Sequence, residues 1–275
     1  MKKFEGILIC TDLDGTLFRK DKSISSENKD AIKYFKSEGG YFTFITGRMP
    51  AYSRTAYETI EPNAPFGCIN GGGLFDHRTG EYVWKSEPLD SDFRLLVEEV
   101  ERRVPQVGIQ LSTFYKTYFT RENAAIERFR RLSGLPDLRR SYSDVDEPIA
   151  KVIIADMNDD VIARVKACLD AHPLAYKFGF IRSEKTLYEI LPKGIDKGTV
   201  LMKMAEYLGV DRRKTVAVGD YDNDVSMLMA AGAGIAVANA TDEAKRAAKY
   251  VTVSNEEHAI AKIISDIESG KIVLK

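Results

Sequence analysis

Aspartates end two separate apolar runs of this sequence. Asp12 and Asp14 come directly after the apolar residues 6–10. Asp220 follows a second apolar run at 215–218. Carboxylates gathered at the ends of buried strands repel one another and lose solvation, which costs free energy unless a cation neutralises them. They are hard oxygen donors without a nearby His or Cys, so the pattern predicts a Mg²⁺ site rather than a zinc site.

The spacing of these acids indicates which of them share a chemical role and which lie in a turn. Asp12 and Asp14 are two positions apart, which places both on one face of an extended chain and favours shared chemistry. Asp222, Asn223 and Asp224 follow Asp220 closely. For Asp222, a place in a turn or at a helix start is the simpler interpretation.

Lys197 is a second chemical signal. It lies in the first turn of a predicted helix that Asp196 caps. The helix dipole disfavours a cation there, so this lysine is expected either to point into water or to face an anion. Because carboxylates and glycine-rich strand ends accompany it, we interpret it as facing an anion.

The elements that must position these residues alternate between strands and helices. Continuous apolar runs predict strands that are covered on both faces. Strands that alternate with helices indicate right-handed crossovers and a parallel sheet, whose ligands bind at the carboxyl ends of the strands. The predicted strands are 6–10, 41–45, 66–69, 215–218 and 234–237, and the predicted helices start near 25, 50, 196, 225, 241 and 255.

The order of predicted elements changes between the two halves of this alternating pattern. Residues 74–84 predict a hairpin, and the segment that follows has its own strands and helices. We therefore predict an α/β fold, a Rossmann-like parallel-sheet core with an inserted α+β cap domain. The core is expected to comprise residues 1–85 and 188–275, and the cap residues 86–187.

Composition excludes several classes of protein. The chain has 275 residues with 40 Lys and Arg against 41 Asp and Glu, a balance that argues against a nucleic-acid binder. No apolar stretch approaches the roughly 18 residues of a membrane span. Its three cysteines lack metal-ligand spacing and are expected to be reduced. We expect a cytoplasmic protein, and the sequence leaves its oligomeric state open.

Four motifs, taken in order, resemble the haloacid dehalogenase-like (HAD) phosphatases. The closest subgroup is the Cof-type hydrolases, which carry an α/β cap inserted after the third core strand. The four motifs are Asp12-Leu13-Asp14-Gly15-Thr16-Leu17, Ile45-Thr46-Gly47-Arg48, Gly194-Ile195-Asp196-Lys197-Gly198 and Gly219-Asp220-Tyr221-Asp222-Asn223-Asp224.

The resemblance implies a role for each matching residue. Asp12 would be the nucleophile that forms an aspartyl-phosphate, and Asp14 the general acid and base. Mg²⁺ would be held by Asp12, the backbone carbonyl of Asp14 and Asp220, with Asp224 in support through water or Lys197. The phosphoryl oxygens would be bound by Leu13, Thr46, Gly47, Lys197 and Asn223.

The resemblance implies a Mg²⁺-dependent phosphatase for small phosphorylated metabolites, in particular sugar phosphates. Asp14 argues against dehalogenation, because dehalogenase relatives lack an acid at that position. Two alternatives remain open: a phosphomutase of the same superfamily, and a non-catalytic sensor of phosphorylated metabolites.

Overall fold

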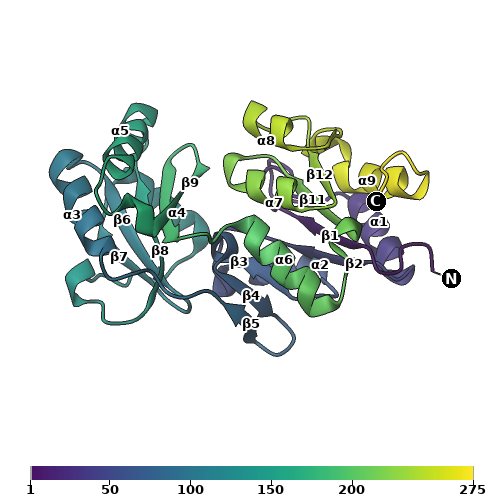
Figure 1. The fold of residues 1–275 in the computed structure, drawn as a ribbon, viewed down its shortest axis with the longest axis horizontal. Coiled ribbons are helices and arrows are strands. Elements are labelled where there is room, and N and C mark those ends of the chain that lie inside the picture. Colours follow the sequence, from purple (N-terminus) through teal and green to yellow (C-terminus); the bar gives the residue numbers. More distant parts are fainter. Residues whose placement is uncertain (1, 275) are drawn as a thin grey trace. The chain divides into compact units, whose positions relative to one another are not determined.

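The computed structural model describes residues 2–274. They divide into two compact units (Figure 1). The core unit comprises the chain up to Arg48, Ser53–Trp84, and the chain from Asp196 onward. The inserted unit comprises Met49–Tyr52 and Lys85–Ile195. No helix among the described residues is both long enough and apolar enough to cross a membrane.

The core unit is built on a five-stranded parallel sheet in the order β13-β12-β11-β1-β2. The three central strands are completely buried, as their apolar sequences predict. The bounds are β1 (Leu8–Thr11), β2 (Tyr41–Phe44), β11 (Thr215–Gly219), β12 (Ala233–Ala236) and β13 (Tyr250–Val251).

Six α-helices accompany this sheet. Helix α1 packs against α9, and α6 packs against α7. Ser25 caps α1, since its side chain accepts a hydrogen bond from the backbone N–H of Asn28. The helices are α1 (Ser26–Ser37), α2 (Arg54–Ile60), α6 (Lys197–Leu208), α7 (Val225–Ala230), α8 (Asp242–Ala247) and α9 (Ala259–Glu268).

The strand predicted at 66–69 was expected in the parallel core sheet, but it belongs to a separate three-stranded sheet. Strand β3 (Phe66–Cys68) pairs antiparallel with β4 (Gly73–Asp76), which forms a three-stranded sheet with β5 (Glu81–Lys85). One parallel bridge, between Ile45 and Gly67, links β3 to the end of β2. Because the turn between β3 and β4 is short, β4 pairs with β3 as its antiparallel neighbour.

The inserted unit has an antiparallel sheet in the order β7-β6-β8-β10-β9. Its apolar core contains residues of α3 and α5, and a smaller apolar cluster contains residues of α4. The elements are α3 (Phe93–Arg103), β6 (Gly108–Thr113), β7 (Thr117–Arg121), α4 (Ala124–Ser133), β8 (Ile149–Ala155), α5 (Asp159–Asp170), β9 (Phe178–Glu184) and β10 (Leu187–Pro192).

The predicted fold class is confirmed, but the domain limits differ. The structure assigns Met49–Tyr52 and Lys85, which were predicted as core, to the inserted unit. The predicted limit between residues 187 and 188 falls inside β10, which pairs with β8 and β9 of the inserted unit. The structure divides the chain after Ile195 instead. A strand bonded on both sides to one sheet cannot belong to the other unit.

Candidate active site

Asp12 and Asp220 meet because the strands that precede them are neighbours. In the sheet, Thr11 of β1 lies opposite Val218 of β11. The backbone N–H of Asp12 donates to the carbonyl of Val218 at 2.8 Å. Both carboxylates therefore leave the carboxyl edge of the sheet side by side, as the sequence predicts.

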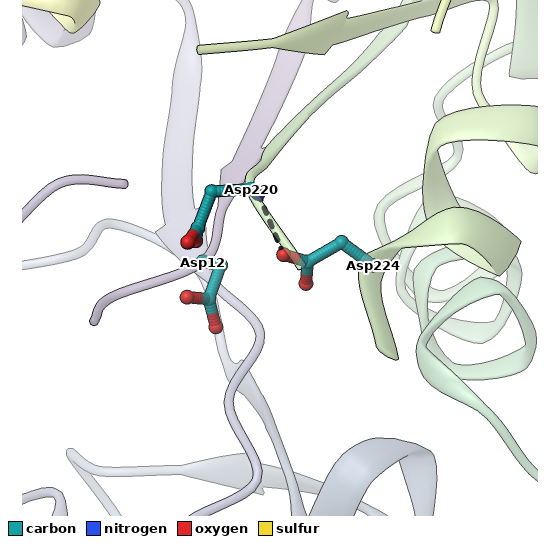
Figure 2. Close-up of side chains that lie close together, drawn as sticks. All are labelled: Asp12, Asp220 and Asp224. Atoms are coloured by element: carbon teal, nitrogen blue, oxygen red, sulfur yellow. Dashed lines mark hydrogen bonds between the residues drawn. The ribbon is translucent and has the colours of Figure 1, made fainter. Parts of the chain in front are cut away.

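Three carboxylates form a tight cluster at this edge. One side-chain oxygen from each of Asp12, Asp220 and Asp224 lies within 4.8 Å of the others (Figure 2). Asp12 and Asp224 are buried, and Asp220 is partly buried. The oxygen-only set, without nitrogen or sulfur ligands, is what a hard divalent cation requires.

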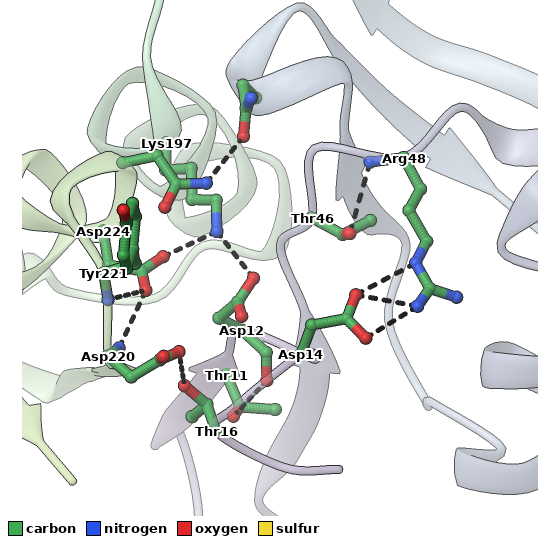
Figure 3. A network of polar contacts seen from close by, with 12 residues as sticks. Thr11, Asp12, Asp14, Thr16, Thr46, Arg48, Lys197, Asp220, Tyr221 and Asp224 are labelled. Atoms are coloured by element: carbon green, nitrogen blue, oxygen red, sulfur yellow. Dashed lines mark hydrogen bonds and ion pairs between the residues drawn. The ribbon is translucent and has the colours of Figure 1, made fainter. Parts of the chain in front are cut away.

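Lys197 supplies one positive charge to the cluster. Its side chain is completely buried, and its Nζ lies 2.6 Å from Oδ1 of Asp12 and 2.6 Å from Oδ1 of Asp224 (Figure 3). Burial alone would lower the pKa of Lys197, but the two carboxylates raise it above its usual value. Lys197 thus faces two carboxylates of the cluster.

Asp224 is fixed by the backbone of its own loop. Its Oδ2 accepts hydrogen bonds from the N–H groups of Asp220 and Tyr221, at 2.8 and 3.0 Å. A side chain at Gly219 would clash, because a Cβ there would lie 2.5 Å from Cβ of Asp224. Glycine at the strand end therefore allows Asp224 to reach Lys197. Asp222 accepts a hydrogen bond from Thr241 and starts a short helical turn, the simpler role expected for it.

One lysine does not neutralise three carboxylates, and the pKa values of Asp12 and Asp220 reflect the excess negative charge. Burial, together with repulsion from Asp224 and Asp220, raises the pKa of Asp12 well above its ordinary value. Burial and the charge of Asp224 raise the pKa of Asp220 to about 7. This excess of negative charge and the oxygen donors fit a divalent cation at the cluster.

Thr16 also belongs to the site, although it was not among the predicted site residues. Its Oγ1 donates to Oδ1 of Asp220 at 2.6 Å. Gly15, with φ of 85°, holds the backbone in the left-handed region, and a Cβ there would lie 2.5 Å from Oδ2 of Asp220. The Gly15-Thr16 pair after the two aspartates is the signal that could have revealed this contact.

The side chain of Asp14 engages a different set of partners. Its carboxylate contacts the guanidinium of Arg48 at 2.7 Å (Figure 3). It also contacts Nζ of Lys22 at 2.8 Å. Burial would raise the pKa of Asp14, but these two cations hold it below its ordinary value. The predicted metal ligand is the backbone carbonyl of Asp14, so the orientation of the side chain leaves that prediction open.

The residues predicted to bind the phosphoryl group follow the ends of three strands. Leu13 follows β1, the Thr46-Gly47 turn follows β2, and Asn223 follows β11. Leu13, Thr46 and Asn223 are all buried. Nδ2 of Asn223 donates to Oδ1 of Asn70 at 3.1 Å. The structure brings these loops together at one edge of the core sheet.

The sequence and the fold place this chain in a known family. The family model for haloacid dehalogenase-like hydrolases matches residues 9–264, and the chain belongs to that family. The predicted resemblance and the enzyme class, a phosphoric monoester hydrolase, are confirmed.

Similar proteins span nearly the whole chain. It is 29% identical to the 5-amino-6-(5-phospho-D-ribitylamino)uracil phosphatase YitU of Bacillus subtilis. The 263 aligned residues cover 94% of this chain and 96% of YitU. It is 30% identical to YwtE, a phosphatase of the same name from that organism, over 96% of this chain and 98% of YwtE. A crystal structure of a haloacid dehalogenase-like hydrolase from Bacteroides thetaiotaomicron has a TM-score of 0.79 at 27% identity, over 95% of this chain and 99% of that one.

Proposed function

We propose that this chain is a Mg²⁺-dependent phosphatase that hydrolyses small phosphorylated metabolites through an aspartyl-phosphate on Asp12. The contact that carries the proposal is the buried Asp12 carboxylate within 2.6 Å of Lys197, at the end of a central strand. A nucleophile placed there meets its substrate beside a fixed positive charge. Phosphoryl transfer depends mainly on such positioning and charge neutralisation.

The first half of the proposed reaction transfers the phosphoryl group to Asp12. A carboxylate oxygen of Asp12 attacks phosphorus, and the bond from phosphorus to the alcohol oxygen breaks. Asp14, protonated once its pairs with Arg48 and Lys22 open, gives its proton to that oxygen as the alcohol leaves. Lys197, the Leu13 amide, the Thr46-Gly47 turn and Asn223 bind the phosphoryl oxygens.

The second half regenerates the enzyme. Asp14, now ionised, takes a proton from water while the water oxygen attacks phosphorus. The bond from phosphorus to Asp12 breaks, and inorganic phosphate leaves. Arg48 and Lys22 support this step, since they stabilise the ionised form of Asp14.

The cation would be held by Asp12, Asp220 and the backbone carbonyl of Asp14. When bound, it would supply positive charge to Asp12 and to a phosphoryl oxygen. Asp224 would support the cation indirectly, because it orients Lys197 and the backbone at Asp220. We propose Mg²⁺ because the donors are oxygen atoms only.

For the substrate we propose sugar phosphates and related phosphorylated polyols. The support is chemical: two relatives carry in their names a phospho-D-ribityl group, which is a phosphorylated polyol. The inserted unit, as a cap domain, would select among such small substrates. It would exclude larger phosphorylated partners such as proteins.

The test replaces the nucleophile. Asp12→Asn should abolish phosphate release from a panel of sugar and polyol phosphates in Mg²⁺, while circular dichroism shows a folded protein. Release above about a hundredth of the wild-type rate would remove Asp12 from the role of nucleophile. An isomerised hexose phosphate without free phosphate would indicate the phosphomutase instead. Binding without turnover in the wild type would indicate a sensor.

A further inference from the structure

The turn that follows β3 holds two residues in an unusual backbone conformation. Ile69 and Asn70 have φ of 56° and 50°, in the left-handed region that non-glycine residues avoid. A β-branched residue such as Ile69 is especially disfavoured there. Such strain persists only where surrounding contacts fix it, and it concentrates at functional sites.

Backbone contacts attach this turn to the candidate active site. The N–H of Ile69 donates to the carbonyl of Arg48 at 3.0 Å, and that of Asn70 to the carbonyl of Thr46 at 3.1 Å. On the far side, Gly71 lies so close to Asp196 that a Cβ would come within 1.9 Å of its carbonyl oxygen. The turn is thus held between the loop after β2 and the residue that precedes Lys197.

The side chain of Asn70 lies between two residues proposed to bind the phosphoryl group. It is completely buried. Its Oδ1 accepts from Nδ2 of Asn223 at 3.1 Å, and a Cβ on Gly47 would lie 3.0 Å from both its Oδ1 and its Nδ2. Its own Nδ2 is buried and has no hydrogen-bond partner.

A buried donor without a partner is costly, because its hydrogen bonds to water are lost and not replaced. A strained backbone adds to that cost. Both features make sense if the amide has a partner during the reaction. The partner must be an acceptor that reaches the space beside Gly47 and Asn223, and the phosphoryl oxygens of the proposed substrate are the acceptors bound there.

We infer that Asn70 is a further phosphoryl-binding residue: its Nδ2 donates to a phosphoryl oxygen, while its Oδ1 orients the amide of Asn223. This inference rests on the proposed function and deepens it. A hydrogen bond to a charged oxygen is stronger than one to a neutral group. Asn70 therefore binds substrate and product phosphate alike.

The test measures affinity for inorganic phosphate in Mg²⁺, by calorimetry and by product inhibition. Asn70→Gly keeps a backbone that tolerates positive φ and removes the amide; it should weaken phosphate binding about 10- to 100-fold. Asn70→Asp keeps the acceptor for Asn223 and replaces the donor with a charged oxygen, so its loss should be larger.

Asn63 provides the matched control. Its amide joins Phe42 and Gly40, at the start of β2, through hydrogen bonds of 2.8 and 2.9 Å. Asn63→Asp should lower the melting temperature and leave phosphate affinity unchanged. Unchanged phosphate affinity in a folded Asn70 variant would overturn the inference, as would an equal loss in Asn63→Asp.

A crystal structure of the wild type grown with Mg²⁺ and inorganic phosphate tests the same contact without a variant. We expect Nδ2 of Asn70 within hydrogen-bond distance of a phosphate oxygen. A bound phosphate that leaves Nδ2 without contact would reject the assignment. Failure of the proposed function would look different: the wild type would release no phosphate from any substrate, whatever the affinity for the free anion.

Discussion

The guanidinium of Arg48 forms a two-point ion pair with the carboxylate of Asp14, with its Nη2 2.8 Å from Oδ1 and 2.7 Å from Oδ2. Only one residue separates Asp14 from Asp12, yet their side chains have different partners (Figure 3). Asp12 shares Lys197 with the acidic cluster, whereas Asp14 is turned to Arg48 and Lys22. The fold thus gives two nearby acids opposite environments, and the pKa of Asp12 is raised while that of Asp14 is lowered.

Removal of Arg48 should therefore raise the pKa of Asp14. In Arg48→Gln, the limb of the pH profile of kcat/KM that Asp14 controls should move to higher pH. The reason is that one of the two cations favouring the ionised carboxylate is lost. The measurement is kcat/KM for an alkyl phosphate from about pH 3, below the ordinary carboxyl pKa, to about pH 8.

Lys22→Gln is the comparison for this variant. Lys22 contacts the same carboxylate, but 65% of its side chain is exposed, against 34% for Arg48. Solvent screens the more exposed pair, so its shift should be in the same direction and smaller. A profile for Arg48→Gln that superimposes on the wild type would show that this ion pair does not set the acidity of Asp14.

Asp14→Asn should lower the rate on the order of 10²–10⁴-fold, the usual share of general acid–base catalysis. The loss should shrink for aryl phosphates, because an aryl alcohol leaves without needing a proton. The test measures the rates of the wild type and of Asp14→Asn on one alkyl and one aryl phosphate. Equal losses on the two substrates would assign Asp14 a role other than proton transfer.

The arrangement of Asp12, Asp220 and Lys197 is the part of the site that sequence could predict. Asp12 and Asp220 each follow an apolar strand, and parallel strands direct their carboxyl ends to one edge. Lys197 lies in the first turn of a helix, where a cation is expected to face an anion. The prediction had to assume only that β1 and β11 are adjacent strands. Their pairing, with Thr11 opposite Val218, shows that they are. Local sequence and one topological rule were therefore enough.

The contacts of Asn70 and Arg48 could not be predicted in the same way. Asn70 is buried through a left-handed turn, and no pattern of apolar residues reports backbone strain. Arg48 reaches Asp14 from another loop, and the rotamers of two long side chains decide that contact. The boundary at β10 was missed because a strand's sequence does not reveal which of two sheets it joins.

The inserted unit contains a buried ion pair that makes a prediction for stability. Nζ of Lys151 on β8 lies 2.8 Å from Oε2 of Glu189 on β10, and both side chains are almost completely buried. Glu189→Gln removes the carboxylate charge beside the buried ammonium and should destabilise the fold by about 3–5 kcal/mol. Replacement of both residues together, by Lys151→Met with Glu189→Leu, should recover most of that loss.

Urea unfolding of the full chain measures these differences. The control is the exposed pair of Lys166 and Asp170 on α5 of the same unit. Asp170→Asn should change stability by less than about 1 kcal/mol, as exposed pairs generally do. Equal destabilisation by Glu189→Gln and Asp170→Asn would show that burial does not decide the strength of the Lys151 pair.

The last prediction concerns the acidic cluster and pH. Because the pKa of Asp220 is raised to about 7 from its ordinary value of 3.8, the folded state binds a proton that the unfolded state releases between these values. In EDTA, stability from this group is fully present below about pH 4 and is lost as pH rises through about 7. A bound divalent cation should replace that proton, so Mg²⁺ should raise the melting temperature more at pH 8 than near pH 5, values on either side of the shifted pKa.

Asp220→Ala separates this effect from the rest of the protein. The variant should lose Mg²⁺ activation together with most of the Mg²⁺-dependent rise in melting temperature. Ca²⁺ should stabilise the wild type but support turnover poorly, because its looser shell does not enforce the octahedral geometry that Mg²⁺ demands. Melting temperature and phosphate release are measured for both proteins in EDTA, Mg²⁺ and Ca²⁺. Full activity in EDTA, or an unchanged Mg²⁺ response in the variant, would show that Asp12 and Asp220 do not form a magnesium site.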